Sequence, residues 1–185
     1  MARVAFHTFG ILVADWDDPV LSGFVERVPA AYASADCSVG FIDRARRLAS
    51  ISDPTTSWGP IVYPAFVEVE QRPRVLATCS LWRDLESVYA FAYAGIHGEA
   101  MKYRKSWVVE NGLSTYVAWW VEDSHQPDFA EAATRLVHLH ENGSTPYAFT
   151  FRQPFDTEGQ PATIDLSVVK GHIVENQGVI EERQG

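Results

Sequence analysis

Short apolar segments alternate with amphipathic helical segments along this chain, and this alternation restricts the fold more than any other feature. Helical spacing of apolar residues begins after Asp18-Pro19, Asp84 and Asp128, where an aspartate can cap the first turn. The segments with the composition of strands are 4–14, 40–48, 74–82, 113–121 and 147–151. This order predicts an α+β chain folded as a ferredoxin-like sandwich, one sheet with helices on one face.

The predicted sheet has one face without a cover. Helices on one side leave the other side bare, yet residues 74–82 and 113–121 are apolar almost throughout. Packing the bare face against a second copy would bury those side chains. The sequence therefore predicts a homodimer.

The predicted domain boundary lies near residue 155. Residues 1–155 are expected to form the sandwich domain, with a short additional strand at Ala65–Glu70. Residues 156–185 are more polar and are interpreted as a C-terminal extension. In that extension, Val168-Val169 and Ile173-Val174 predict the two arms of a hairpin.

Composition and charge exclude several classes of partner. The chain has 185 residues and a formal net charge of −9, and such a surface repels the phosphates of nucleic acids. No apolar run reaches the roughly 20 residues of a membrane span, and the N-terminal residues lack the apolar core of a signal peptide. We therefore expect a cytoplasmic protein without nucleic-acid or membrane partners. Cys37 and Cys79 have no metal-ligand spacing and are expected to be buried thiols.

The segment 81–107 carries the most chemical information in the chain. Gly95 and Gly98 interrupt a helical pattern on either side of His97. Glycine allows close approach to the backbone, so a flat ligand would find room beside this imidazole. The alternative is a structural histidine that is hydrogen-bonded among aromatic residues, which is the more common role of a helical histidine in such surroundings.

A helical face next to His97 combines aromatic and basic side chains. Tyr93, His97, Met101 and Arg104 follow one another at helical spacing. Three nearby cations, Lys102, Arg104 and Lys105, suit the carboxylates of a ligand. The alternative interpretation is a solvated face, in which Glu99 pairs with Lys102.

The pattern of Trp82, Phe91, His97, Arg104 and Trp107, followed by Trp119-Trp120 and residues 145–151, resembles a bacterial family of domains of unknown function. That family is assigned to the dimeric α+β barrel superfamily, whose members include antibiotic-biosynthesis monooxygenases and spheroidene monooxygenase. The resemblance covers roughly residues 4–155, and residues 52–73 stand as an insertion. It implies a barrel built from two subunits, with a ligand cavity between sheet and helices in each.

The resemblance also implies a haem site and an oxidative, monooxygenase-like activity in small-molecule biosynthesis. In haem-degrading relatives the axial histidine lies on the helix after a tryptophan-bearing strand, and His97 matches that position. Arg104, Lys102 and Lys105 would then hold the propionates, and His7 or Thr8 would line the distal side. A histidine-ligated haem supports oxygen activation or electron transfer.

Two alternatives need no metal. In cofactor-free monooxygenases and cyclases of the superfamily, the cavity binds a phenol or polyketide, and His97 would be the general base. The third interpretation is a small-molecule binding protein without catalysis. In each case the predicted pocket is aromatic, and its residues are Trp82, Phe91, Tyr93, Met101, Tyr103, Trp107 and Trp119.

Overall fold

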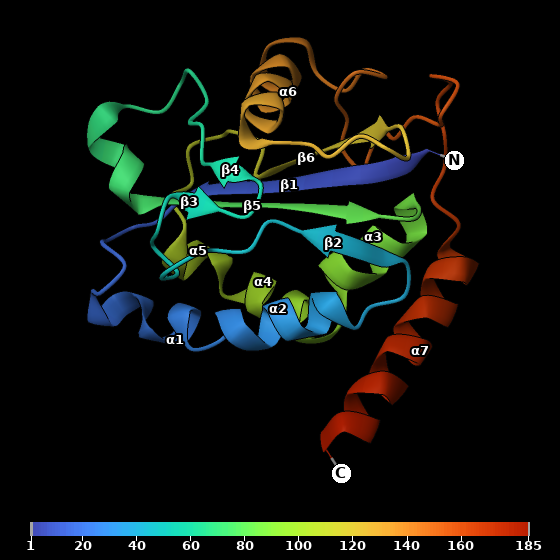
Figure 1. Ribbon diagram of the computed structural model, residues 1–185, viewed down its shortest axis with the longest axis horizontal. Coiled ribbons are helices and arrows are strands. Elements are labelled where there is room, and N and C mark those ends of the chain that lie inside the picture. The colour runs from blue at the N-terminus through green and yellow to red at the C-terminus, as the bar shows by residue number, and fades with distance from the viewer. Residues whose placement is uncertain (1, 185) are drawn as a thin grey trace.

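A four-stranded antiparallel sheet forms the centre of the computed structural model, which describes residues 2–184 and the side chains as far as Val179 (Figure 1). The sheet order is β2-β5-β1-β6. The two strands of a separate small sheet are β3 (Thr55–Thr56) and β4 (Gly59–Pro60). The strands of the main sheet are β1 (Arg3–Ile11), β2 (Phe41–Arg44), β5 (Val75–Trp82) and β6 (Tyr116–Val121).

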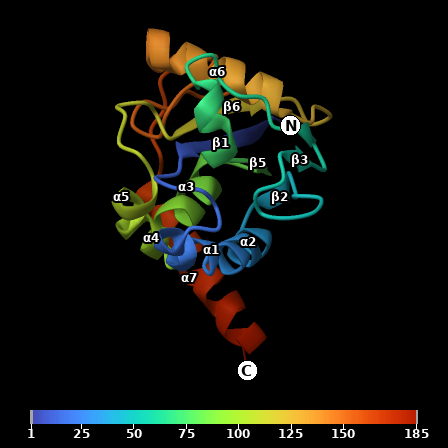
Figure 2. The same cartoon turned by 90° about the vertical axis from the view of Figure 1, so that its left-hand side faces the viewer.

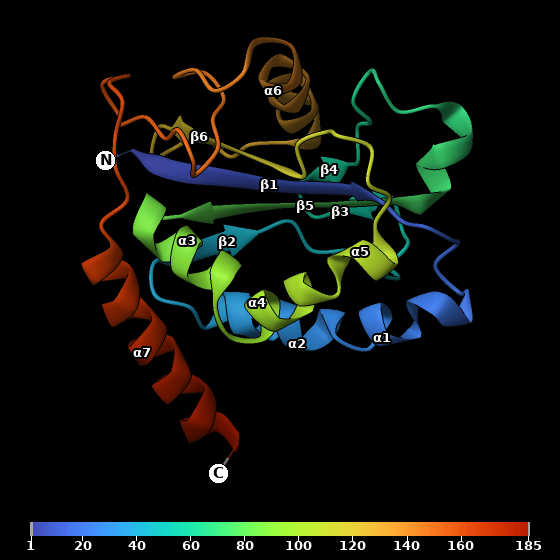
Figure 3. The ribbon, with the colours of Figure 1, turned by 180° about the vertical axis from the view of Figure 1, so that it is seen from behind.

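Helices pack on both faces of this sheet (Figure 2). Helix α6 covers one face, and α1 to α5 lie on the other (Figure 3). The 3-10 turns are η1 (Pro19–Leu21) and η2 (Val69–Arg74). The α-helices are α1 (Ser22–Val25), α2 (Val28–Asp36), α3 (Leu85–Tyr93), α4 (Gly95–Lys102), α5 (Arg104–Trp107), α6 (Phe129–Asn142) and α7 (Leu166–Gln184).

The α+β prediction is confirmed, and the strand order is compatible with a ferredoxin-like sandwich. The central strand β1 pairs with β5 and β6, while β2 extends the sheet beyond β5. The helices between β1 and β2, and those between β5 and β6, return the chain to the same face. Aspartates cap three of the turns as expected, because Asp18, Asp84 and Asp128 each accept a hydrogen bond from a backbone N–H of the first turn.

The expectation of a bare sheet face is wrong. Phe129 and Leu136 of α6 pack in one core cluster with Ala5, Phe9 and Trp119 of the sheet. The segment between β2 and η2 extends this cover with Trp58, Ile61 and Val67. The apolar strands are therefore buried within one chain, which removes the reason given above for a homodimer.

The C-terminal segment forms a helix, so the predicted hairpin is wrong. Asp165 accepts hydrogen bonds from the backbone N–H groups of Ser167 and Val168, which starts α7. Val169 and Ile173 are four residues apart, so both lie on the helix face that packs against α3. Helical spacing explains the paired apolar residues that the hairpin was meant to explain.

Two predicted strands are also absent from the sheet. Residues 65–70 form a turn that leads into η2, where Pro73 lacks the N–H that a strand would need. Residues 147–151 make isolated bridges, such as Ala118 with Phe149, without continuing as a strand.

Cys79 is buried, and burial raises the pKa of its thiol, whereas Cys37 is partly exposed. Among the described residues, no helix combines the length and hydropathy needed to cross a bilayer.

Candidate functional site

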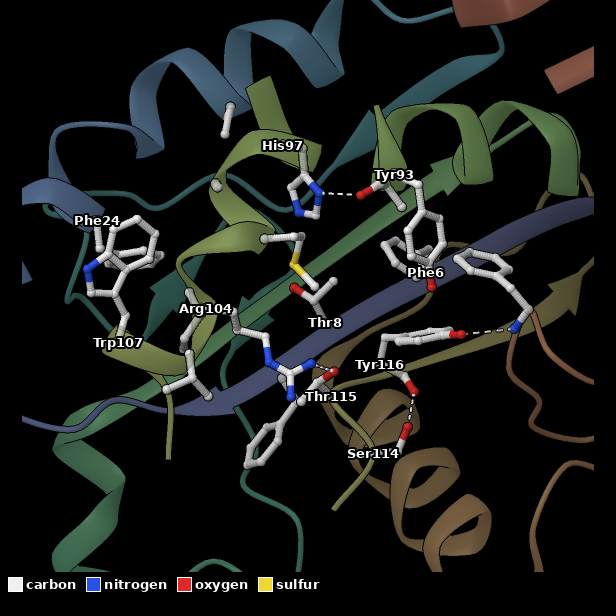
Figure 4. Close-up of a pocket in the computed structure, with 18 of the residues that line it drawn as sticks. Phe6, Thr8, Phe24, Tyr93, His97, Arg104, Trp107, Ser114, Thr115 and Tyr116 are labelled. Atoms are coloured by element: carbon white, nitrogen blue, oxygen red, sulfur yellow. Dashed lines mark hydrogen bonds between the residues drawn. The ribbon is translucent and has the colours of Figure 1, made fainter. Parts of the chain in front are cut away.

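A cavity of about 550 Å³ lies between the sheet and the helices α1 to α5 (Figure 4). This volume falls within the range of roughly 300–1,000 Å³ that small-molecule sites occupy. Strands contribute Phe6, Thr8 and Tyr116 to its wall, and the helices contribute His97 and Trp107. The cavity therefore joins residues that lie more than a hundred positions apart in the chain.

A backbone turn places His97 in the wall of this cavity. Helix α3 ends at Tyr93, Ala94 is extended, and Gly95 adopts a φ of +56°, which favours glycine. Helix α4 then starts in a new direction. As a result, Nδ1 of His97 lies 2.8 Å from the carbonyl oxygen of Ala92, near the end of α3.

This contact selects one tautomer of the His97 imidazole. A carbonyl oxygen only accepts hydrogen bonds, so Nδ1 carries the proton and Nε2 keeps a free lone pair. Nε2 has no hydrogen-bond partner among the described residues, and it points into the cavity (Figure 4). Burial lowers the pKa of His97, which the bond to Ala92 only partly offsets. The ring is therefore neutral at neutral pH, and Nε2 is able to accept a proton or bind a metal.

Neither of the two glycines beside His97 lines the cavity. A Cβ on Gly98 would lie 2.6 Å from the carbonyl oxygen of Tyr93. Gly98 therefore allows α4 to approach the end of α3, and Gly95 provides the turn. Both residues serve the placement of His97 rather than the ligand.

Of the predicted basic cluster, the structure places only Arg104 in the cavity wall. Lys102 pairs with Glu99, and Lys105 pairs with Glu110, and both lysines are exposed. For these two residues the solvated-face alternative is confirmed. Arg27 and Arg152 also line the cavity, and the sequence analysis missed both. They come from distant segments, and no local pattern marks them.

The predicted aromatic pocket is brought together only in part. Tyr93, Met101 and Trp107 line the cavity as expected, whereas Tyr103 is exposed and lies outside its wall. Trp119 is fully buried on the opposite face of the sheet, in the core under α6.

Trp82 and Phe91 support the site from behind. The ring of Trp82 stacks on Phe91 with 5.1 Å between centroids, and its Nε1 donates to Ser80. The Phe91 ring in turn lies 4.8 Å from the His97 ring. These two side chains hold the imidazole in place without lining the cavity.

Five aromatic residues of the wall were not predicted, and three of them form one group. Phe6, Tyr116 and Phe151 pack against one another with centroid distances between 5.0 and 5.7 Å. The hydroxyl of Tyr116 accepts a hydrogen bond from the backbone N–H of Phe151, which anchors the group. Period-two alternation along residues 4–8 would have separated Phe6 and Thr8 from Ala5 and His7, and so identified the cavity face.

His7 lies on the opposite face of β1 and does not line the cavity, whereas Thr8 does. The expected distal role of His7 is therefore wrong, because neighbouring strand residues point to opposite faces. The ring is buried and lies 6.0 Å from Phe129 of α6. Nδ1 lies 2.8 Å from the carbonyl oxygen of Thr78, and Nε2 has no hydrogen-bond partner among the residues that the structure describes.

Buried His7 should make the fold sensitive to acid. Burial lowers the pKa of His7 to about 4. Between roughly pH 6.5 and pH 4, His7 is protonated in the unfolded chain but not in the folded chain. The free energy of unfolding should therefore decrease by about 3 kcal/mol as the pH is lowered through this interval. His7→Phe should lose less stability over this interval, as measured by urea unfolding at both ends. Equal losses in the two proteins would contradict the prediction.

Comparison with known proteins places the chain in a family. No curated protein and no solved structure matches it. The family model of a domain of unknown function, DUF3291, matches residues 3–165, which include the whole sheet and all of the cavity wall. The expected resemblance to a domain of unknown function is thereby confirmed, and the chain belongs to the DUF3291 family.

Proposed function

We propose that this chain is a tailoring enzyme of small-molecule metabolism, which binds a hydrophobic substrate in the cavity and uses Nε2 of His97 as a general base. One observation carries the proposal: the bond from Nδ1 to Ala92 leaves an unprotonated, unpartnered Nε2 facing the cavity. A general base must be neutral at the working pH and within reach of the proton that it removes. The lowered pKa of His97 meets the first condition.

The cavity wall favours a planar, aromatic-sized substrate. Phe6, Tyr116 and Phe151 offer ring faces and edges on one side, and Phe24 and Trp107 do so on another. Aromatic pairs gain about 0.5–1.5 kcal/mol beyond the burial of their area, so a ring would be bound and oriented here. Phenols and cyclisable polyketides combine such a body with an acidic proton for His97.

Turnover of a compound panel tests this proposal directly. The purified full chain is incubated in air with phenols, polyketide-type diketones and isoprenoids, and the products are analysed by mass spectrometry. A product heavier by oxygen indicates a monooxygenase, and one lighter by a water molecule or of unchanged mass indicates a dehydrating or isomerising cyclase. If compounds bind in the cavity but none is converted, the chain is a binding protein and the proposal fails.

Haem-dependent oxidation is a second candidate, because the donors fit. A haem takes an axial side chain such as histidine, and its propionates are carboxylates that an arginine would bind. Nε2 of His97 and the guanidinium of Arg104 would supply these, whereas Lys102 and Lys105 lie outside the cavity wall. A ring N–H held by a backbone carbonyl is typical of metal-ligating histidines. Bound haem would supply oxygen activation or electron transfer.

An absorption spectrum decides between the two candidates. If haem binds, adding haemin to the protein should give a sharp Soret band that His97→Ala shifts or abolishes. His140→Ala is the matched control, since His140 is exposed and lies outside the cavity wall. A spectrum that His97→Ala leaves unchanged would overturn the assignment of His97 as iron ligand.

A homodimer and a cytoplasmic location remain part of this proposal, as does a relation to the dimeric α+β barrel monooxygenases. A barrel made by packing two sheets would require α6 to leave its place over β1 and β6, because Phe129 and Leu136 occupy that face. Any self-association that leaves the fold unchanged would therefore use another surface.

A further inference from the structure

The cavity concentrates positive charge in an acidic protein. The chain has 24 Asp and Glu against 15 Lys and Arg. Nevertheless, the described cavity wall contains three arginines but no Asp or Glu. The three arginines are Arg27, Arg104 and Arg152. Within the described part of the chain, no carboxylate pairs with these arginines.

Arg104 is the partly buried arginine of the cavity wall, and most of its N–H donors have no partner among the described residues. It is partly buried, and its one hydrogen bond joins Nη1 to Oγ1 of Thr115 at 3.4 Å. Four other partly buried guanidinium groups each donate at least two hydrogen bonds, and they belong to Arg3, Arg44, Arg47 and Arg135. Arg74 also donates only one, to the carbonyl oxygen of Val13 at 3.4 Å, but it lies outside the cavity wall. A guanidinium carries five N–H donors in a planar fork, so most donors of Arg104 are left for another partner.

The other two arginines occupy different positions around the cavity. Arg27 lies over the rings of Tyr103 and Trp107, with 5.6 and 5.7 Å to their centroids. Arg152 follows Phe151 and is exposed. Both therefore contribute a positive potential that would attract an anion. Arg104 lies deeper, beside Thr115 in Figure 4.

We infer that the ligand of this cavity carries a carboxylate, which Arg104 binds through its unused N–H donors while the apolar body lies against the aromatic wall. The inference rests on the proposed function, because it names the substrate class of the same cavity. A planar carboxylate matches the fork of a guanidinium with two parallel hydrogen bonds. Partial burial strengthens that interaction relative to one in open water.

Two probes of nearly equal shape test the inference on the full chain. 2-Naphthoate and 2-naphthamide share a flat apolar body, and only the first is charged at neutral pH. Calorimetric titration should show that naphthoate binds about 10- to 100-fold more tightly, as expected for charge-assisted hydrogen bonds. In Arg104→Gln this preference should disappear, while the affinity for naphthamide stays within about twofold and shows that the cavity is intact.

Lys105→Gln is the matched control. It removes the same charge one residue away, from an exposed side chain outside the cavity wall. It should leave the preference for naphthoate within about twofold of the wild type. Equal loss in the two variants would overturn the inference, because the effect would then come from overall charge.

Two further outcomes separate this inference from the proposed function. If wild-type protein binds both probes equally, the carboxylate inference fails, while His97 remains a candidate base for a neutral substrate. If neither probe binds, the carboxylate inference fails, and turnover of the compound panel still decides the proposed function.

Discussion

Replacing His97 with asparagine should lower kcat/KM by about 100- to 10,000-fold for whichever panel compound the protein converts. The asparagine amide can still donate to the carbonyl of Ala92, as Nδ1 of His97 does at 2.8 Å. What the variant loses is Nε2, the ring nitrogen that faces the cavity. Substrate binding should therefore survive while proton removal fails, so the loss should fall mainly on kcat.

The pH profile makes this test specific for a base. In the wild type, kcat/KM should fall as pH decreases through the pKa of His97, and burial lowers that pKa below the usual imidazole value. His97→Asn should lack this acidic limb. His140→Asn, on an exposed position of α6, should keep both the rate and the limb. If His97→Asn retained the limb, another group would be the base.

Gly40→Ala should lower the free energy of unfolding by about 3 kcal/mol. Gly40 has a φ of +71°, a conformation that costs other residues about 1–2 kcal/mol. A Cβ there would also lie 2.2 Å from Oγ and 2.6 Å from Cβ of Ser87, a buried residue of α3. Overpacking of this kind typically costs about 1–3 kcal/mol more.

Gly112→Ala separates the cost of the backbone conformation from the cost of overpacking against Ser87. Gly112 has nearly the same φ, +73°, but a Cβ there would meet nothing within 4 Å. This variant should therefore lose only about 1–2 kcal/mol, the backbone part. Urea unfolding of both variants gives the difference. Equal losses would show that the contact between Gly40 and Ser87 relaxes without cost.

The site was predictable where its geometry is local. The interruption of the helix around His97 could be predicted, because Gly95 and Gly98 weaken a helix wherever the rest of the chain lies. The structural role of these glycines could not be predicted. Gly98 is needed because α4 packs closely against the backbone of Tyr93, and this contact arises only when the two helices pack together. Likewise, Lys102 and Arg104 look alike along the chain, but only Arg104 lines the cavity.

Residues remote in the chain were beyond prediction for a different reason. Arg27 and Arg152 line one cavity because the junction of α1 and α2 and the segment after α6 meet around it. The hairpin prediction for Val168-Val169 and Ile173-Val174 was wrong. Two pairs of adjacent apolar residues, with Val169 and Ile173 four positions apart, are compatible with two strands and also with one face of a helix. Packing of Val169 against α3 selects the helix.

The amino-acid sequence by itself determined the α+β class, the capped helix starts at Asp84 and Asp128, and the broken helix that carries His97. These depend on backbone conformation and on hydrogen bonds between residues a few positions apart. Only the tertiary structure decided which face of β1 lines the cavity, what covers the other face, and which arginines line the cavity without a carboxylate partner. Those outcomes depend on burial and charge compensation among elements far apart in sequence, which no local pattern encodes.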